Sequence, residues 1–138
     1  MGFVVSDKFQ FELVAPEKLI YSDDAEFVVV PGVEGDFGVL PGHALLLSTV
    51  RPGVVEIHEN DKPKERFFVG GGFAEVTPER CTVLCTESLN LVDFDESKAN
   101  TRLENAEREL SEASSDLERE KCEKALEVAR SLISAGSS

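Results

Sequence analysis

The sequence contains no tryptophan, a single tyrosine and only three cysteines among its 138 residues. The scarcity of large aromatics argues against a carbohydrate-binding surface, because such surfaces need exposed aromatic platforms. A small, odd number of cysteines is typical of free thiols in a reducing compartment. Basic residues are also few, since 14 Lys and Arg stand against 27 Asp and Glu and the net charge is −13. A nucleic-acid or anionic lipid partner is therefore not expected.

Long hydrophobic runs are absent as well. The longest strongly apolar runs, at residues 27–30 and 44–47, have four residues, whereas a helix needs about 20 to cross a bilayer. The amino terminus has no basic segment followed by a long apolar one, so it does not resemble a secretory signal. We therefore expect a cytoplasmic protein that does not insert into a membrane.

The composition and the spacing of apolar residues change near Asp93. This change predicts one domain over residues 1–92 and another over 93–138. All six prolines and nine of the ten glycines precede Asp93. In this first region, short apolar stretches alternate with polar residues between turn signals, as half-buried strands do. The pattern predicts an antiparallel β-sandwich or barrel. The expected strands lie near residues 9–13, 26–30, 44–50, 54–58, 66–69, 73–77, 81–86 and 88–92.

The second region switches to helical spacing, with neither glycine nor proline from residue 95 to 134. Asp93 with Glu96, and Ser115 with Glu118, have the spacing of helix N-caps. We therefore predict two antiparallel helices joined by a short connection. Their apolar stripes are mostly alanine and leucine and bury too little surface to be firmly folded alone. Either a movable arm or a fixed helical tail is consistent with this pattern.

Residues with catalytic or metal-binding chemistry do not cluster. Cys81 and Cys85 are four residues apart in a predicted strand, which separates them by ~13 Å, too far to share a zinc ion or form a disulfide. His43 and His58 have no Cys or His neighbour at ligand spacing. No Ser, His and acid grouping occupies a nucleophile turn. We expect no catalytic residue, no metal site and no enzymatic activity.

The segment at residues 31–44, PGVEGDFGVLPGHA, is the densest motif of the chain. Its glycines do not indicate a phosphate-binding loop, because the segment carries Glu34 and Asp36 and ends in Pro41-Gly42 rather than in a helix. The segment is consistent with two interpretations: a pair of tight turns, or a rigid acidic loop that binds basic or polar groups of a partner.

This motif and three later segments closely resemble the epsilon-subunit family of bacterial F-type ATP synthases, the counterpart of the mitochondrial delta subunit. The later segments are residues 50–55, 68–76 and 81–84. The resemblance implies an amino-terminal β-sandwich of about ten strands followed by an α-helical hairpin. It also implies a non-catalytic rotor subunit of the central stalk of a proton-translocating enzyme, peripheral on the cytoplasmic face of the bacterial inner membrane.

The same resemblance implies partners and contact residues. The gamma subunit is one partner, with the broad apolar face of the sandwich and residues 70–73 as its candidate contacts. The membrane-embedded ring of c subunits is another, and the matching positions for the ring contact are Glu34, Gly35, Asp36 and His43. Cationic groups on the loops of the ring would pair with this acidic segment. The alternative function is a free-standing β-sandwich binding module.

In relatives of this family the hairpin reaches the alpha and beta catalytic subunits and blocks hydrolysis, and in some it binds ATP. The matching nucleotide positions here are Asp95, Lys98 and Ala99. Lys98 stands where the family motif has arginine, and lysine lacks the planar fork that holds a phosphate. Residues 95–134 also carry eleven acids against seven bases. The sequence therefore predicts no cofactor, ATP only as a weak regulatory ligand, and weak or absent inhibition.

Overall fold

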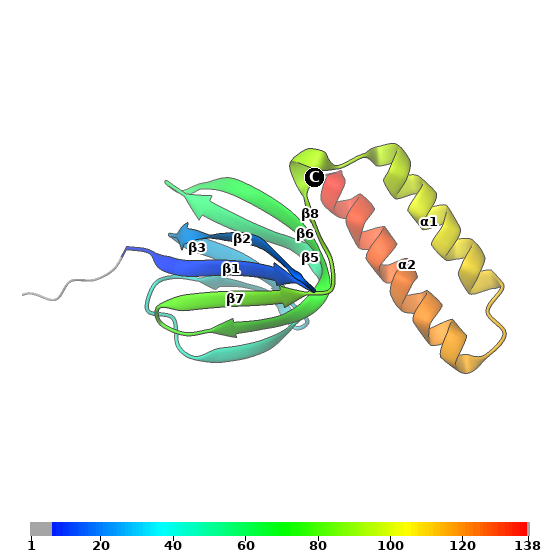
Figure 1. Cartoon of the computed structure of the whole chain (residues 1–138), viewed down its shortest axis with the longest axis horizontal. Coiled ribbons are helices and arrows are strands. Elements are labelled where there is room, and N and C mark those ends of the chain that lie inside the picture. The colour runs from blue at the N-terminus through cyan, green and yellow to red at the C-terminus, as the bar shows by residue number, and fades with distance from the viewer. Residues whose placement is uncertain (1–6, 138) are drawn as a thin grey trace, which may run out of the picture. The chain divides into compact units, whose positions relative to one another are not determined.

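A computed structural model describes residues 7–137, and the chain divides into two compact units after Asn90 (Figure 1). The described part of the first unit holds eight strands. They are β1 (Phe9–Ala15), β2 (Lys18–Ala25), β3 (Phe27–Gly32), β4 (Gly35–Val39), β5 (Leu46–Glu59), β6 (Lys62–Val76), β7 (Arg80–Cys85) and β8 (Ser88–Asn90). The second unit holds a 3₁₀ turn η1 (Leu91–Asp93) and helices α1 (Glu96–Ser111) and α2 (Asp116–Gly136).

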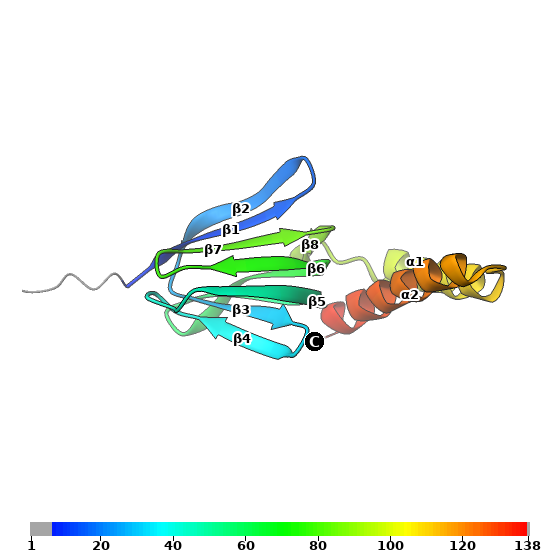
Figure 2. The same cartoon turned by 90° about the horizontal axis from the view of Figure 1, so that it is seen from below.

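The strands form one sheet in the order β2-β1-β7-β6-β5-β3-β4, and β8 pairs with β6 outside this path (Figure 2). Neighbouring strands are antiparallel except β1 and β7, which are parallel. The expectation of a purely antiparallel sandwich therefore needs this correction. A parallel pair is possible here because most of the domain lies between the two strands and supplies the long crossover.

The described residues form eight strands, whereas the resemblance implies about ten. β5 and β6 each run through two predicted segments without a break. Their pairing continues across the bend, where Pro52 lies opposite Gly70 and Gly53 opposite Val69. The two halves of β6 pair with different neighbours, residues 67–69 with β8 and residues 72–76 with β7. Glycines at the bend thus turn the strand while its ladder persists.

Two strands were not predicted. β2 is an edge strand that is mostly exposed, so it lacks a clear alternation of apolar and polar residues. β4 has the sequence GDFGV, whose two glycines were interpreted as part of a turn. Seven of the eight described strands, β1 to β7, place side chains in one core. The core comprises Phe9, Phe11, Leu13, Ala25, Val28, Val30, Val39, Val50, Val55, Ile57, Phe67, Val69, Ala74, Val76, Cys81, Val83 and Cys85.

The second unit is the predicted helical hairpin. Ala106, Leu126 and Ala129 are buried between the helices, and Leu103 and Leu110 pack against them. Ser115 caps α2 as expected, since its side chain accepts a hydrogen bond from the Glu118 N–H. The other predicted cap is wrong, because Asp93 lies in η1 and Asp95 caps α1. Within residues 7–137, neither helix is long and apolar enough to span a bilayer.

Candidate functional site

The turn between β3 and β4 presents three of the four predicted ring-contact residues. The last pairs of the hairpin are Pro31 with Asp36 and Gly32 with Gly35. Glu34, Gly35 and Asp36 are all exposed. Gly35 has a φ of 131°, a backbone conformation that favours glycine. The sequence therefore folds here as a tight acidic tip.

Arg51, from the bend of β5, reaches both arms of this hairpin. Its Nη1 donates to the Gly32 carbonyl oxygen at 2.5 Å, and its Nη2 donates to Asp36 Oδ1 at 2.6 Å. About 40% of the Arg51 side chain and 60% of the Asp36 side chain are exposed. Sequence reasoning missed Arg51, because it lies 15 residues from Asp36. Its position just before Pro52-Gly53 was the available signal of a bend.

Backbone contacts anchor the same turn to β5. The Val33 N–H donates to the Thr49 carbonyl oxygen at 3.0 Å. Pro31 is buried, and a Cβ added to Gly53 would lie 2.9 Å from the Pro31 Cβ, so ring and glycine are in close contact. The turn is therefore fastened to β5 before its tip by Pro31 and Val33, and after its tip by the Arg51–Asp36 pair.

His43 does not lie with the other predicted contact residues. β4 runs from Gly35 to Val39 and carries the chain from the turn to the opposite end of the sheet (Figure 2). Four residue steps along a strand amount to ~13 Å. The His43 Nδ1 lies 2.7 Å from the Ala44 carbonyl oxygen. The structure therefore groups Glu34, Gly35 and Asp36, and places His43 elsewhere.

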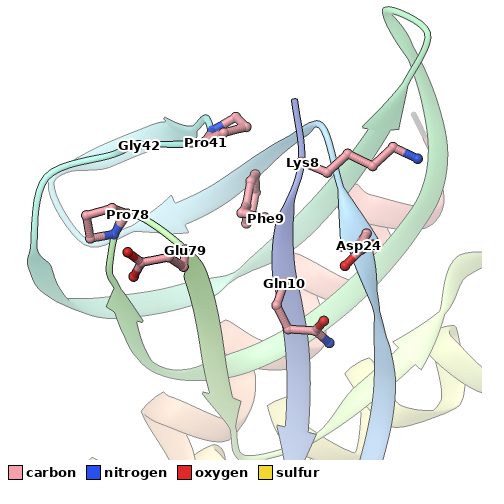
Figure 3. Close-up of a pocket in the computed structure, with 8 residues that line it drawn as sticks. All are labelled: Lys8, Phe9, Gln10, Asp24, Pro41, Gly42, Pro78 and Glu79. Carbon is pink, nitrogen blue, oxygen red and sulfur yellow. The ribbon is translucent and has the colours of Figure 1, made fainter. Parts of the chain in front are cut away.

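A pocket of about 460 Å³ lies beside the His43 loop, where the Gly42 N–H donates to the Pro78 carbonyl oxygen at 2.9 Å (Figure 3). Its lining combines a buried phenylalanine with prolines and charges of both signs: Lys8, Phe9, Gln10, Asp24, Pro41, Gly42, Pro78 and Glu79. None of these lining residues is a serine, threonine, cysteine or histidine.

The three predicted nucleotide positions differ in what they offer to a ligand. The Asp95 carboxylate accepts a hydrogen bond from the Lys98 N–H at 3.1 Å as the N-cap of α1. Ala99 is buried. Of these three predicted positions, Lys98 is the one that lines a groove of about 360 Å³. The other residues that line this groove are Thr101, Arg102, Asn105, Ala106, Glu109 and Ala125.

Two of the three cysteines, Cys81 and Cys85, show no sign of a reactive or metal-binding site. Cys81 and Cys85 are buried core residues. Burial raises the pKa of the Cys81 thiol to about 12 and also raises that of Cys85. Neutral thiols are poor nucleophiles and poor metal ligands. In the described part of the chain, no three His, Cys, Asp or Glu side chains are grouped to hold a metal ion.

The outer face of the sheet carries a row of apolar side chains. Phe73 in β6 pairs with Leu84 in β7, which pairs with Val14 in β1, which in turn pairs with Leu19 in β2. Leu19, Phe73 and Leu84 are 56%, 42% and 51% exposed. Leu47 in β5 is 64% exposed and lines an apolar groove of about 340 Å³ between β5 and β6. We refer to Leu19, Leu47, Phe73 and Leu84 as the apolar face.

An anchored acidic turn and an exposed apolar face are features of a protein that binds other proteins. Comparison with known proteins agrees with this class. The family described as "ATP synthase, Delta/Epsilon chain, beta-sandwich domain" matches residues 8–90. The ATP synthase epsilon chain of Rhodospirillum rubrum is 47% identical over 131 residues, covering 95% of this chain and 98% of the relative. That of Paramagnetospirillum magneticum is 43% identical, with the same coverage of both chains.

Solved structures have the same fold. A chain of the Euglena gracilis mitochondrial ATP synthase assembly of OSCP, F1 and c-ring matches with a TM-score of 0.80 and 24% identity, covering 96% of this chain and 84% of that one. A chain from the Tetrahymena thermophila central stalk and c-ring matches with a TM-score of 0.64 and 14% identity, covering 96% and 99%. The family match and the close relatives show that the protein belongs to the delta/epsilon chain family of ATP synthases.

Proposed function

We propose that this chain is a non-catalytic rotor subunit of the central stalk of a proton-translocating ATP synthase, linking the gamma subunit to the c-ring. The observation that carries the proposal is the match to ATP synthase epsilon chains over nearly the full length of both proteins. The assembly lies on the cytoplasmic face of the bacterial inner membrane, where this subunit is peripheral. Its part in ATP synthesis and hydrogen ion transport is mechanical.

The β3–β4 turn is the proposed contact with the c-ring. Glu34, Gly35 and Asp36 are exposed at its tip, and the tip is fastened to β5 by Arg51 and by the Val33 N–H. Two carboxylates and one guanidinium give the tip a net negative charge, which suits cationic or polar loops. His43 lies at the other end of β4 and is not part of this proposed surface.

The apolar face is the proposed contact with gamma. It offers several large exposed side chains in adjacent strands, which is unusual for a surface that faces only water. Glu75 lies opposite Leu47 in the β5–β6 ladder and is exposed beside this face. A gamma surface that is apolar with a basic rim would match both the side chains and the net charge of −13.

The hairpin is the proposed contact with the alpha and beta catalytic subunits, with weak regulation of hydrolysis. Asp95 is engaged as an N-cap and Ala99 is buried, which leaves Lys98 as the polar side chain for ATP among the predicted positions. The same groove also holds Arg102 and Glu109, whose opposite charges add no net attraction for a polyphosphate to that of Lys98. These features favour weak ATP binding.

Replacement of Phe73 and Leu84 by glutamate tests the partner and the face together. Tagged wild-type chain should recover gamma and the catalytic subunits from cell extract. The double variant should recover at least about tenfold less gamma, because two buried charges would be unpaired in the contact. Leu117→Glu is the matched control, since Leu117 is 64% exposed on α2. Thermal unfolding of each variant checks that it folds.

Two results would contradict these proposals. A free-standing binding module would recover neither gamma nor the catalytic subunits with the wild-type chain. Normal recovery of gamma by a folded Phe73→Glu, Leu84→Glu variant would move the contact away from the apolar face.

A further inference from the structure

We propose that Arg51 is a positioning residue, which holds the β3–β4 turn through its forked guanidinium group and neutralises Asp36, so that Glu34 makes the ionic contact with the partner. The inference rests on the proposed c-ring contact and deepens it. It assigns different roles to two carboxylates that the sequence alone treats as equivalent.

The geometry requires an arginine. One planar group donates from Nη1 to the carbonyl of Gly32, before the tip, and from Nη2 to the carboxylate of Asp36, after it. The two arms of the hairpin are thus tied to each other and to β5 at once. A lysine ammonium is a point donor on a flexible stem and does not have this fixed fork. Arg51→Lys therefore keeps the charge and removes the clamp.

The two carboxylates of the tip have different surroundings. Asp36 is paired with Arg51 at 2.6 Å. Glu34 is exposed, and within residues 7–137 it makes no hydrogen bond or ion pair. A cation that approached Asp36 would compete with Arg51, whereas one that approached Glu34 would meet an unpaired charge. Glu34 is therefore the residue that attracts a cationic group.

The clamp also joins the tip to the sheet. Arg51 lies at the bend of β5, and β5 pairs with β6 along most of its length, from Leu46 opposite Val76 to Glu59 opposite Lys62. Because Gly53 also packs against Pro31, a lateral force on the tip passes into β5 rather than swinging a free hairpin. A stiff tip transmits displacement that a loose tip would absorb.

The test compares Arg51→Lys with Arg66→Lys, a control that makes the same change at the Arg66–Glu56 ion pair in the sheet. In the full chain, hydrogen exchange is measured at the Val33 amide, which donates to Thr49, and at the Gln10 amide, which donates to Glu79. Arg51→Lys should accelerate exchange at Val33 about tenfold and leave Gln10 unchanged. Arg66→Lys should change neither.

The second readout is ATP-driven proton pumping by inverted membrane vesicles that contain the assembled enzyme with each variant. Arg51→Lys should cause a partial loss of pumping while ATP hydrolysis stays unchanged, and Arg66→Lys should cause none. Glu34→Lys should cause a larger loss, because it places a cation against the cations of the ring while the clamp is intact.

Unchanged exchange at Val33 in Arg51→Lys would overturn the inference. Faster exchange with full pumping would overturn it too, since Arg51 would then stabilise the turn without positioning it for coupling. The Glu34→Lys variant shows whether full pumping in Arg51→Lys contradicts only the role of Arg51 or also the proposed ring contact. If it impairs pumping, the turn is still the ring contact. If pumping is full in all variants, the proposed ring contact is also wrong.

Discussion

At the scale of single residues, Gly72 allows β6 and β7 to approach more closely than a side chain would permit. Its φ is 154°, and a Cβ at this position would overlap the Leu84 carbonyl oxygen and lie 2.8 Å from the Cys85 Cα. Both atoms belong to the backbone of a paired strand and cannot move aside. Relief of the clash would require separation of the β6–β7 ladder.

Gly72→Ala should therefore lower the free energy of unfolding by more than about 3 kcal/mol, the range of severe packing and strain mutations. Chemical denaturation of the full chain measures the loss. Gly42→Ala is the matched control, because Gly42 has a φ of 81° with nothing within 4 Å of its Cβ position. Strain alone should cost the control about 1 kcal/mol. Equal losses would show that the close approach of β7 contributes nothing.

At the scale of elements, α2 begins with a network of three hydrogen bonds. Ser115 Oγ accepts from the Glu118 N–H at 3.1 Å. The Glu118 carboxylate in turn accepts from the Ser114 N–H at 3.0 Å and from its hydroxyl at 3.2 Å. The hydrogen bond from the Ser114 N–H is the main reason that the pKa of Glu118 is lowered, and the hydroxyl adds to it. Donors that helix geometry leaves unpaired are thus satisfied locally.

Ser115→Ala should destabilise the start of α2 by about 1 kcal/mol. Hydrogen exchange at the first amides of α2 should then be about fivefold faster. Ser97→Ala in the first turn of α1 is the control, since the Ser97 side chain makes no capping bond to that helix. An unchanged rate in Ser115→Ala would show that packing with α1, rather than the cap, holds this end.

The same cap gives the hairpin a defined response to pH. Because the pKa of Glu118 is lower in the folded chain than its ordinary value of 4.5, the carboxylate stabilises the fold above that ordinary value. The contribution is lost as the pH falls through the lowered folded pKa. In the exchange experiment, the wild-type advantage over Glu118→Gln should be present at neutral pH and disappear in acid.

At the scale of the whole molecule, the two units differ in the size of their hydrophobic cores and in the binding surfaces that they carry. The first has a core of its own to which seven strands contribute, and it carries both the acidic turn and the apolar face. The second buries mainly alanine and leucine between its helices. We therefore propose that the stalk contacts reside in the first unit and that the second unit is not needed for assembly.

Deletion of residues 93–138 should change the ATPase activity of the assembled enzyme by less than about twofold, because the proposed regulation by this net acidic hairpin, with eleven acids against seven bases in residues 95–134, is weak. The truncated chain should still recover gamma from extract, which controls for folding. A rise in ATPase activity of several fold would show that the hairpin is a strong inhibitor.

Local patterns predicted much of this architecture. Alternation in Phe9, Phe11 and Leu13 indicated a strand because successive side chains point to opposite faces. Helical spacing and the Ser115 cap indicated α2 because both depend on residues within one or two turns. The strand boundaries were predicted wrongly where pairing with a distant strand outweighs the local turn preference. Pro52-Gly53 was interpreted as a break, yet the ladder between β5 and β6 continues across it.

What the sequence determined by itself is therefore what neighbouring residues decide: the strand and helix patterns and the acidic motif. What only the tertiary structure decided depends on residues far apart in the chain. Arg51 meets Asp36 because β5 bends beneath the β3–β4 turn, and His43 is separated from the turn because β4 is a strand. The apolar face exists because five neighbouring strands, β2, β1, β7, β6 and β5, set outward side chains beside one another. Distances of this kind are fixed by strand pairing and core packing, which no short window of sequence contains.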